Sequence, residues 1–303
     1  MNHNPYRAYW EKAQEQSLKL AQYYTPECLV ELCIELLQPK GELFDPCCGL
    51  GSFLLKAKSK DPDLKISGND IAKDLGELPF EFTNSDYLNS EDKEYDYIIA
   101  NIPFNLKKTH CQLVDENYCW IEKIIKNTRK KALIILPNMV NSRHNPKILA
   151  KRKQIVENRV LELIIQLPSH LFTKTAIGPC LWIINKEKDQ KDLYFLYAAR
   201  ERFSTKENNK KQRTLTDENV REICNKENWV LGTYEKIKEH DYCLMPGVYD
   251  ENDDKPQETE EEIKAKIKTL AKEIRGIHEN LKKSQDWFDK LLKDLENHGE
   301  LLD

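Results

Sequence analysis

Short apolar runs alternate with amphipathic stretches over the first two thirds of the chain. Several runs, such as 132–136 and 161–165, are apolar almost throughout, which is typical of strands covered on both faces. The runs predict strands at 42–45, 65–70, 80–83, 95–100, 131–136, 160–167 and 180–185, with helices at 52–60, 115–130 and 146–157. This alternation favours an α/β fold with a doubly wound, mostly parallel sheet.

Changes in composition divide the rest of the chain. Residues 6–22 are rich in Gln, Lys and Glu and predict a helix, and Thr25 is a candidate N-cap for a second helix that begins at Pro26. The expected parts are an N-terminal helix (1–22), a main catalytic domain (23–200), a small mixed extension (201–249), a charged linker (250–258) and a C-terminal helix (259–298).

The C-terminal helix has a coiled-coil pattern. Its apolar residues recur in steps of four and three from Ile263 to Leu295, and Ser284 is the one interruption of that seam. The alternative is an amphipathic helix packed on its own domain. Because a charged linker precedes the helix, pairing with another chain is favoured.

Charge and cysteine usage narrow the class of protein. The net charge of −4 gives no general attraction to nucleic acid, so DNA contact requires a local patch or a partner. Basic residues cluster at 123–131 and 147–153, where a solvated helix face competes with a DNA contact. The nine scattered cysteines lack Cys-x-x-Cys spacing and predict reduced thiols without a metal site. Without a leader or long apolar span, a cytoplasmic location with no membrane contact is expected.

A glycine turn follows the first predicted strand. Residues 45–51 read Asp-Pro-Cys-Cys-Gly-Leu-Gly, and Gly49 and Gly51 let the backbone approach a ligand closely. No lysine follows, so this is not a phosphate loop. Asp45 could face a cationic group, Asp70 a ribose diol and Asp86 an adenine amine. Each acid alone could be a helix N-cap; together with the turn they favour a nucleoside cofactor.

The sequence Asn101-Ile102-Pro103-Phe104 ends a later strand. The Asn101 side-chain carbonyl and the Ile102 backbone carbonyl could accept the two hydrogens of an amine, and Phe104 could stack on a base. A bare Asn-x-Pro-Phe is also found in ordinary strand-end turns. Its spacing from the glycine turn favours a methyl donor and an acceptor amine held side by side.

Taken together, these segments resemble amino-methyltransferases that carry Asn-Pro-Pro-Phe/Tyr. More narrowly, they resemble the DNA adenine-N6 methyltransferase (modification) subunits of type I restriction–modification systems. The resemblance spans about residues 20–250. It is carried by Tyr23–Pro26, Asp45–Leu54, Ile165–Pro168 with Leu171–Phe172, Leu181–Lys186 and Asp241–Tyr249.

The resemblance implies a Rossmann-like sheet and S-adenosylmethionine-dependent methylation of the exocyclic amine of an adenine flipped out of DNA. It implies that a specificity subunit docks on the C-terminal helix, with a restriction subunit as a further partner. The implied catalytic residues are Asn101, Ile102, Pro103 and Phe104, and the implied cofactor-binding residues are Tyr24, Thr25, Asp45, Cys47, Gly49, Gly51, Asp70 and Asp86.

One departure keeps other functions open. Ile102 replaces the first proline of the family motif, although it still offers a backbone carbonyl and still precedes Pro103. The alternatives are an RNA or protein-glutamine methyltransferase and a catalytically inactive subunit that binds cofactor or bridges partners.

Overall fold

The computed structural model describes residues 25–73, 75–104, 115–172, 177–187, 192–206 and 211–250, together with Arg275 and Gln285. The chain divides into two units, Met1–Asp250 and Glu251–Asp303, and every element below belongs to the first. The predicted helix at 6–22, the linker and the C-terminal helix lie outside the described residues, apart from Arg275 and Gln285, which are helical.

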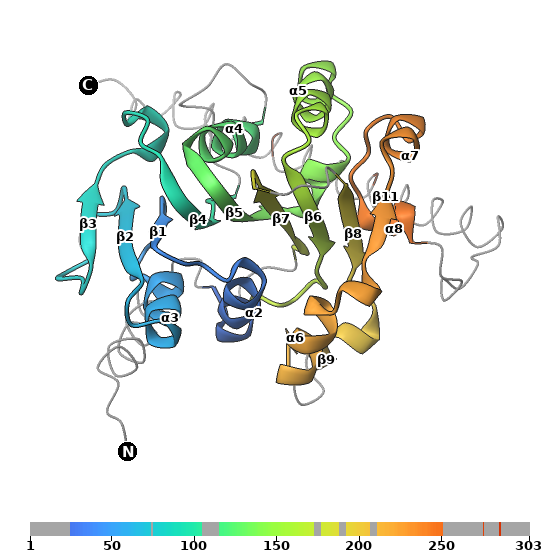
Figure 1. The fold of residues 1–303 in the computed structure, drawn as a ribbon. Helices are drawn as coiled ribbons and strands as arrows, with labels where there is room; N and C mark the ends of the chain where they lie inside the picture. The colour runs from blue at the N-terminus through green and yellow to red at the C-terminus, as the bar shows by residue number, and fades with distance from the viewer. Residues whose placement is uncertain are drawn as a thin grey trace, which may run out of the picture. The chain divides into compact units, whose positions relative to one another are not determined.

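A mostly parallel sheet forms the centre of the first unit, with nine strands in the order β11-β8-β6-β7-β5-β4-β1-β2-β3 (Figure 1). Of these strands, β7 and β11 run antiparallel to their neighbours. The strands are β1 (Glu42–Asp45), β2 (Lys65–Asp70), β3 (Glu81–Asn84), β4 (Tyr95–Asn101), β5 (Thr128–Pro137), β6 (Leu161–Gln166), β7 (Pro179–Asn185), β8 (Leu193–Tyr197) and β11 (Val230–Gly232).

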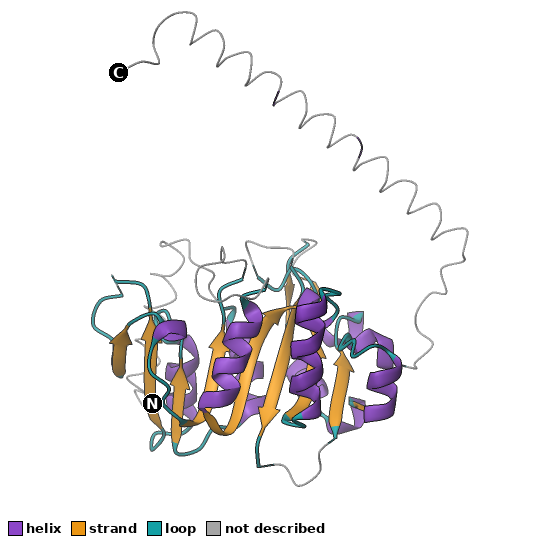
Figure 2. Ribbon diagram, turned by 90° about the horizontal axis from the view of Figure 1, so that it is seen from above, coloured by secondary structure: helices purple, strands orange, loops and turns teal. Residues whose placement is uncertain are grey.

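Helices cover both faces of this sheet. One apolar core packs α2 (Glu27–Leu37), α3 (Ser52–Lys60) and α6 (Asp217–Cys224) on one face, and the other packs α4 (Asn117–Asn127), α5 (Pro146–Glu157), α7 (Tyr234–Glu239) and α8 (Pro246–Tyr249). In Figure 2, seen from above, helices overlie the strands. Successive side chains of a strand point to opposite faces of the sheet. On β1, Leu43 accordingly packs in the core with α2, α3 and α6, and Phe44 packs in the core with α4 and α5. The doubly wound α/β prediction is confirmed.

The described part of this unit also contains two smaller features. The strands β9 (Thr205–Lys206) and β10 (Arg213–Thr214) form a separate antiparallel ribbon. Four 3-10 helices connect elements: η1 (Tyr87–Asn89), η2 (Asn138–Asn141), η3 (Glu201–Phe203) and η4 (Lys226–Asn228). In the described part of the chain no helix is both long enough and apolar enough to cross a membrane.

Some local expectations were wrong. The helix predicted at 115–130 ends at Asn127, because Thr128 already pairs with Tyr95 and begins β5. Pro26, rather than Thr25, occupies the N-cap of α2. Among the described cysteines, seven are free thiols, but Cys119 is disulfide-bonded, so the expectation of reduced thiols fails there.

Residues of both basic clusters form ion pairs or hydrogen bonds with other residues of the first unit. Arg129 pairs with Glu42 and Asp96 at 2.9 and 2.8 Å, and the lysines at 126, 130 and 131 each lie near a carboxylate. In the second cluster Arg152 is buried and donates to the backbone oxygens of Tyr242, Arg143 and Val140. Such pairing favours a structural role over DNA contact.

Candidate active site

A cavity of about 360 Å³ lies where the carboxyl ends of β1, β2, β3 and β4 meet. Parallel strands place these ends at one edge, the usual position of a ligand site in a doubly wound sheet. The cavity is lined by Pro46, Cys47, Gly49, Asn69, Asp70, Ile71, Ser85, Asp86, Tyr87, Leu88, Asn101, Ile102, Pro103, Phe104, Trp120 and Phe172.

The glycine turn connects β1 to α3 beneath this cavity. Gly51 is the N-cap of α3 with φ +83°, and a Cβ there would lie 2.4 Å from Cε1 of Phe80, so only glycine fits. Gly49 has φ +51° and lines the cavity, with no atom within 4 Å of where its Cβ would be. The turn therefore presents bare backbone to a ligand.

Asp70 ties the turn to β2. Its carboxylate accepts the Gly49 amide at 2.8 Å and the Ala72 amide at 2.9 Å. Each oxygen keeps a second lone pair, so Asp70 can still accept from a ligand hydroxyl. Beside it, the Ile71 side chain is 66% exposed and lines the cavity, offering an apolar surface to a flat ring.

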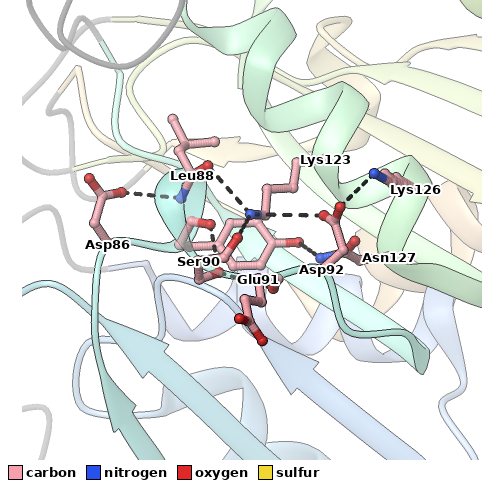
Figure 3. A network of polar contacts seen from close by, with 9 residues as sticks. Asp86, Leu88, Ser90, Glu91, Asp92, Lys123, Lys126 and Asn127 are labelled. Atoms are coloured by element: carbon pink, nitrogen blue, oxygen red, sulfur yellow. Dashed lines mark hydrogen bonds and ion pairs between the residues drawn. The ribbon is translucent and has the colours of Figure 1, made fainter.

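Asp86 serves both the fold and the cavity. It caps η1 by accepting the Leu88 amide at 3.1 Å, and it also lines the cavity. Figure 3 shows how Lys123 holds this segment by donating to the carbonyls of Leu88 and Ser90 at 3.4 and 2.5 Å. Burial lowers the pKa of Lys123. Helix α4 thus fixes the loop that carries Asp86.

Asp45 lies behind the turn and is not among the lining residues. It is 1% exposed, and its carboxylate accepts the Cys47 amide at 3.0 Å. Burial raises the pKa of Asp45 to about 8, and the nearby Asp70 charge adds to this shift. A cation bound beside Asp45 would oppose this shift.

Two contacts fix Asn101 at the end of β4. Its Nδ2 donates to Thr25 Oγ1 at 2.9 Å, so its Oδ1 is left as the acceptor. The Cys47 thiol donates to the Asn101 backbone carbonyl at 3.3 Å. Burial raises the Cys47 pKa well above its usual range, which keeps the sulfur protonated as a donor. The glycine turn and the Asn-Ile-Pro-Phe segment are thereby joined directly.

Aromatic side chains line the same cavity beyond Asn101. The rings of Phe104 and Phe172 meet edge to face, with centroids 6.4 Å apart and planes at 78°. Trp120 of α4 stacks on Tyr87 at 5.5 Å. Ile102 is 2% exposed and packs in the core shared with α4 and α5.

The structure brings together most of the predicted site residues: Cys47, Gly49, Asp70, Asp86 and Asn101–Phe104 line one cavity. Thr25 contacts Asn101 without lining the cavity, and Asp45 and Gly51 support the turn from behind. Tyr24 lies outside the described residues.

Eight residues that line the cavity were not among the predicted site residues, namely Pro46, Asn69, Ile71, Ser85, Tyr87, Leu88, Trp120 and Phe172. Ile71 had a local signal, since it directly follows a strand-end acid. Phe172 belongs to a segment that carried the family resemblance without being assigned to the site. For Trp120, one aromatic residue on an amphipathic helix gave no signal.

The sheet order and the cavity at its edge define a methyltransferase fold. The type I restriction–modification methyltransferase subunit from Streptococcus thermophilus has a similar structure, with a TM-score of 0.67 and 22% identity over 75% of this chain and 59% of that one. A sequence model of N-6 DNA methylases matches residues 9–78 and 68–259. The chain belongs to the N-6 DNA methylase family.

Curated relatives agree with this family. The HindI methylase subunit of Haemophilus influenzae is 26% identical over 78% of this chain and 65% of its own length. The MjaIX methylase subunit of Methanocaldococcus jannaschii is 25% identical over 87% of this chain and 59% of its own. Both are named type I restriction enzyme methylase subunits, and the chain spans less than two thirds of either.

The raised pKa of Asp45 predicts how stability changes with pH. The folded state holds this proton up to about pH 8, whereas the unfolded chain releases it near pH 4. The contribution of protonated Asp45 to the free energy of unfolding is therefore complete below about pH 4 and is lost as pH rises through about 8. Asp45→Asn keeps an acceptor for Cys47 but cannot ionise.

We expect the melting temperature of the ligand-free wild type to fall, relative to Asp45→Asn, between about pH 5 and pH 9. Thermal unfolding of both proteins across this range measures the effect. Parallel curves would contradict the assigned pKa.

Proposed function

We propose that the chain methylates the exocyclic amine of adenine in DNA, using S-adenosylmethionine, as the modification subunit of a type I-like restriction–modification complex. The observation that carries the proposal is that Asn101, with its carboxamide oriented by Thr25, lines the same cavity as the glycine turn. A donor in the turn and an amine at Asn101 would then be neighbours.

The cavity suits S-adenosylmethionine chemically. Its volume falls within the range of about 300–1,000 Å³ typical of small-molecule sites. Asp70 and Asp86 offer acceptors for ribose hydroxyls and an adenine amine, and Ile71 and Leu88 offer apolar contact. The described residues that line the cavity include no lysine or arginine, in keeping with a cationic ligand that has no phosphate. When bound, this cofactor supplies an electrophilic methyl group.

Asn101 and Ile102 would prepare the amine. Its nitrogen lone pair is delocalised into the ring, and acceptors at Asn101 Oδ1 and the Ile102 carbonyl would localise it by binding both hydrogens. Phe104 and Phe172 provide rings for a base extruded from the duplex. Isoleucine supplies the same carbonyl as proline, and its burial in the core replaces the rigidity of a ring.

The implied partners fit the sequence outside the described residues. The heptad pattern at 259–298 suits docking of a specificity subunit, which would supply the DNA sequence preference, and a restriction subunit would be a further partner. We expect such a complex to act in the cytoplasm. RNA or protein-glutamine substrates and an inactive scaffold are the alternatives, and the oriented Asn101 amide favours an active enzyme over the scaffold.

Two substitutions should separate methyl transfer from cofactor binding. We expect Asn101→Ala to reduce transfer by at least about 100-fold with unchanged cofactor affinity, because the lost acceptor acts on the amine. We expect Asp70→Ala to weaken cofactor affinity by at least about tenfold. Calorimetry with S-adenosylmethionine and tritiated methyl transfer measure the two effects. Near-normal turnover by Asn101→Ala would remove the site assignment.

Thr25 offers a finer test, because its hydroxyl accepts from the Asn101 amide. Thr25→Val preserves shape but removes this acceptor, and we expect kcat to fall about tenfold while KM for the cofactor stays unchanged. Thr25→Ser should restore kcat. A raised cofactor KM with normal kcat would instead indicate direct cofactor contact by Thr25.

A further inference from the structure

A second, polar cavity of about 330 Å³ lies beside the candidate active site. Asn138 follows the end of β5, Gln166 ends β6, and Gly178 precedes the antiparallel β7, so these residues share the sheet edge that carries the first cavity. The loop after β6 contributes to both cavities: Ser169 lines the second and Phe172 the first.

The second cavity is rich in hydrogen-bond donors. Arg213 of β10 lines it, and one nitrogen of the Arg213 guanidinium donates to Ser204 Oγ at 2.7 Å. Asn138 Oδ1 accepts from Asn141 at 3.0 Å, which leaves the Asn138 amide hydrogens to donate. Gln166 Oε1 is buried without a hydrogen-bond partner, so this orientation offers an acceptor, and the carboxamide would have to flip to donate to an anion.

Arg213 is the one charged residue among the described residues that line this cavity. Arg213 stands directly opposite Lys206 in the β9–β10 ribbon, an arrangement that is normally unfavourable for two like charges. Glu201 lies 3.6 Å from Arg213 and 3.3 Å from Lys206, and its side chain is 82% exposed. A solvated carboxylate is a weak partner for Arg213, and the described residues that line the cavity include no carboxylate.

We propose that this cavity binds a backbone phosphate of the DNA strand that carries the target adenine. A guanidinium with carboxamide and hydroxyl donors is the set that recognises phosphate oxygens. The inference rests on the proposed function, since a strand that delivers a base to Phe104 and Phe172 must pass along this edge of the sheet. Its flanking phosphates would then need cationic partners there.

Two hydrogen bonds connect this site to the base pocket. The Arg213 amide donates to the His170 carbonyl at 2.9 Å, and the Gln212 side chain donates to the Leu171 carbonyl at 3.0 Å. The segment that carries Gln212 and Arg213 therefore holds the part of the β6–β7 loop that contains Phe172. Phosphate bound by Arg213 would anchor the strand beside the ring that receives its base.

The test is DNA affinity, measured by fluorescence anisotropy with the full chain in its co-purified complex at several salt concentrations. We expect Arg213→Gln to raise Kd at least about tenfold and to lower the slope of log K against log salt by about 0.9, the value for one lost phosphate contact. Lys206→Gln removes the same charge from the same ribbon outside the cavity. We expect it to change Kd by less than about threefold.

Asn138→Asp gives a second test with little change in shape. The aspartate can still accept from Asn141 but brings a negative charge into the cavity, so we expect a larger loss of DNA affinity than in Arg213→Gln. Unchanged cofactor affinity shows that each variant is folded.

The outcomes separate the two proposals. Equal losses in Arg213→Gln and Lys206→Gln, or wild-type affinity and salt slope in both cavity variants, would overturn the phosphate site while leaving the proposed methylation intact. DNA binding by the wild type without methyl transfer would remove the proposed function, and the variants would still decide the phosphate site. Absence of DNA binding by the wild type would overturn both.

Discussion

The parallel pairing of β1 with its two neighbours is the constraint on which the rest of the site depends. Leu43 pairs with Ile66 on one side and with Tyr97 on the other. This register brings the ends of three strands, distant in sequence, to one edge of the sheet. Strand pairing alone would leave the connecting loops free to vary. The bonds from the Gly49 amide to Asp70 and from the Cys47 thiol to the Asn101 carbonyl fix them.

The proposed binding sites for the methyl donor and for the acceptor amine are connected to each other within the protein. The turn that would hold the methyl donor and the residue that would hold the amine are joined through Cys47, so neither can shift alone. Thr25, just before α2, completes this support from outside the sheet. A reaction that depends chiefly on positioning benefits from such rigidity. The isoleucine at position 102 fits the same scheme, because burial in the core restrains the backbone there.

Much of the fold was predictable because its signals are local. Uninterrupted apolar runs identified the buried strands, and the acids and glycines at strand ends identified the cavity edge. The features that could not be predicted from the sequence depend on tertiary contacts. The hydrogen bond between Thr25 and Asn101 spans 76 residues, and Trp120 reaches the cavity only because α4 packs above β4 and η1. The basic cluster at 123–131 is compatible with DNA contact in the sequence alone, but in the folded chain Arg129 pairs with Glu42 and Asp96.

We expect the exocyclic amine of a DNA adenine, placed at Asn101, to receive a methyl group from the cofactor in the adjoining turn. The most direct measurement is tritiated methyl transfer from S-adenosylmethionine to unmethylated genomic DNA, using the protein co-purified with its partners, followed by digestion to nucleosides. We expect the label to appear in N6-methyladenine. Measurable cofactor binding with no label in DNA would contradict it and would direct attention to RNA, to protein glutamine or to a subunit without catalysis.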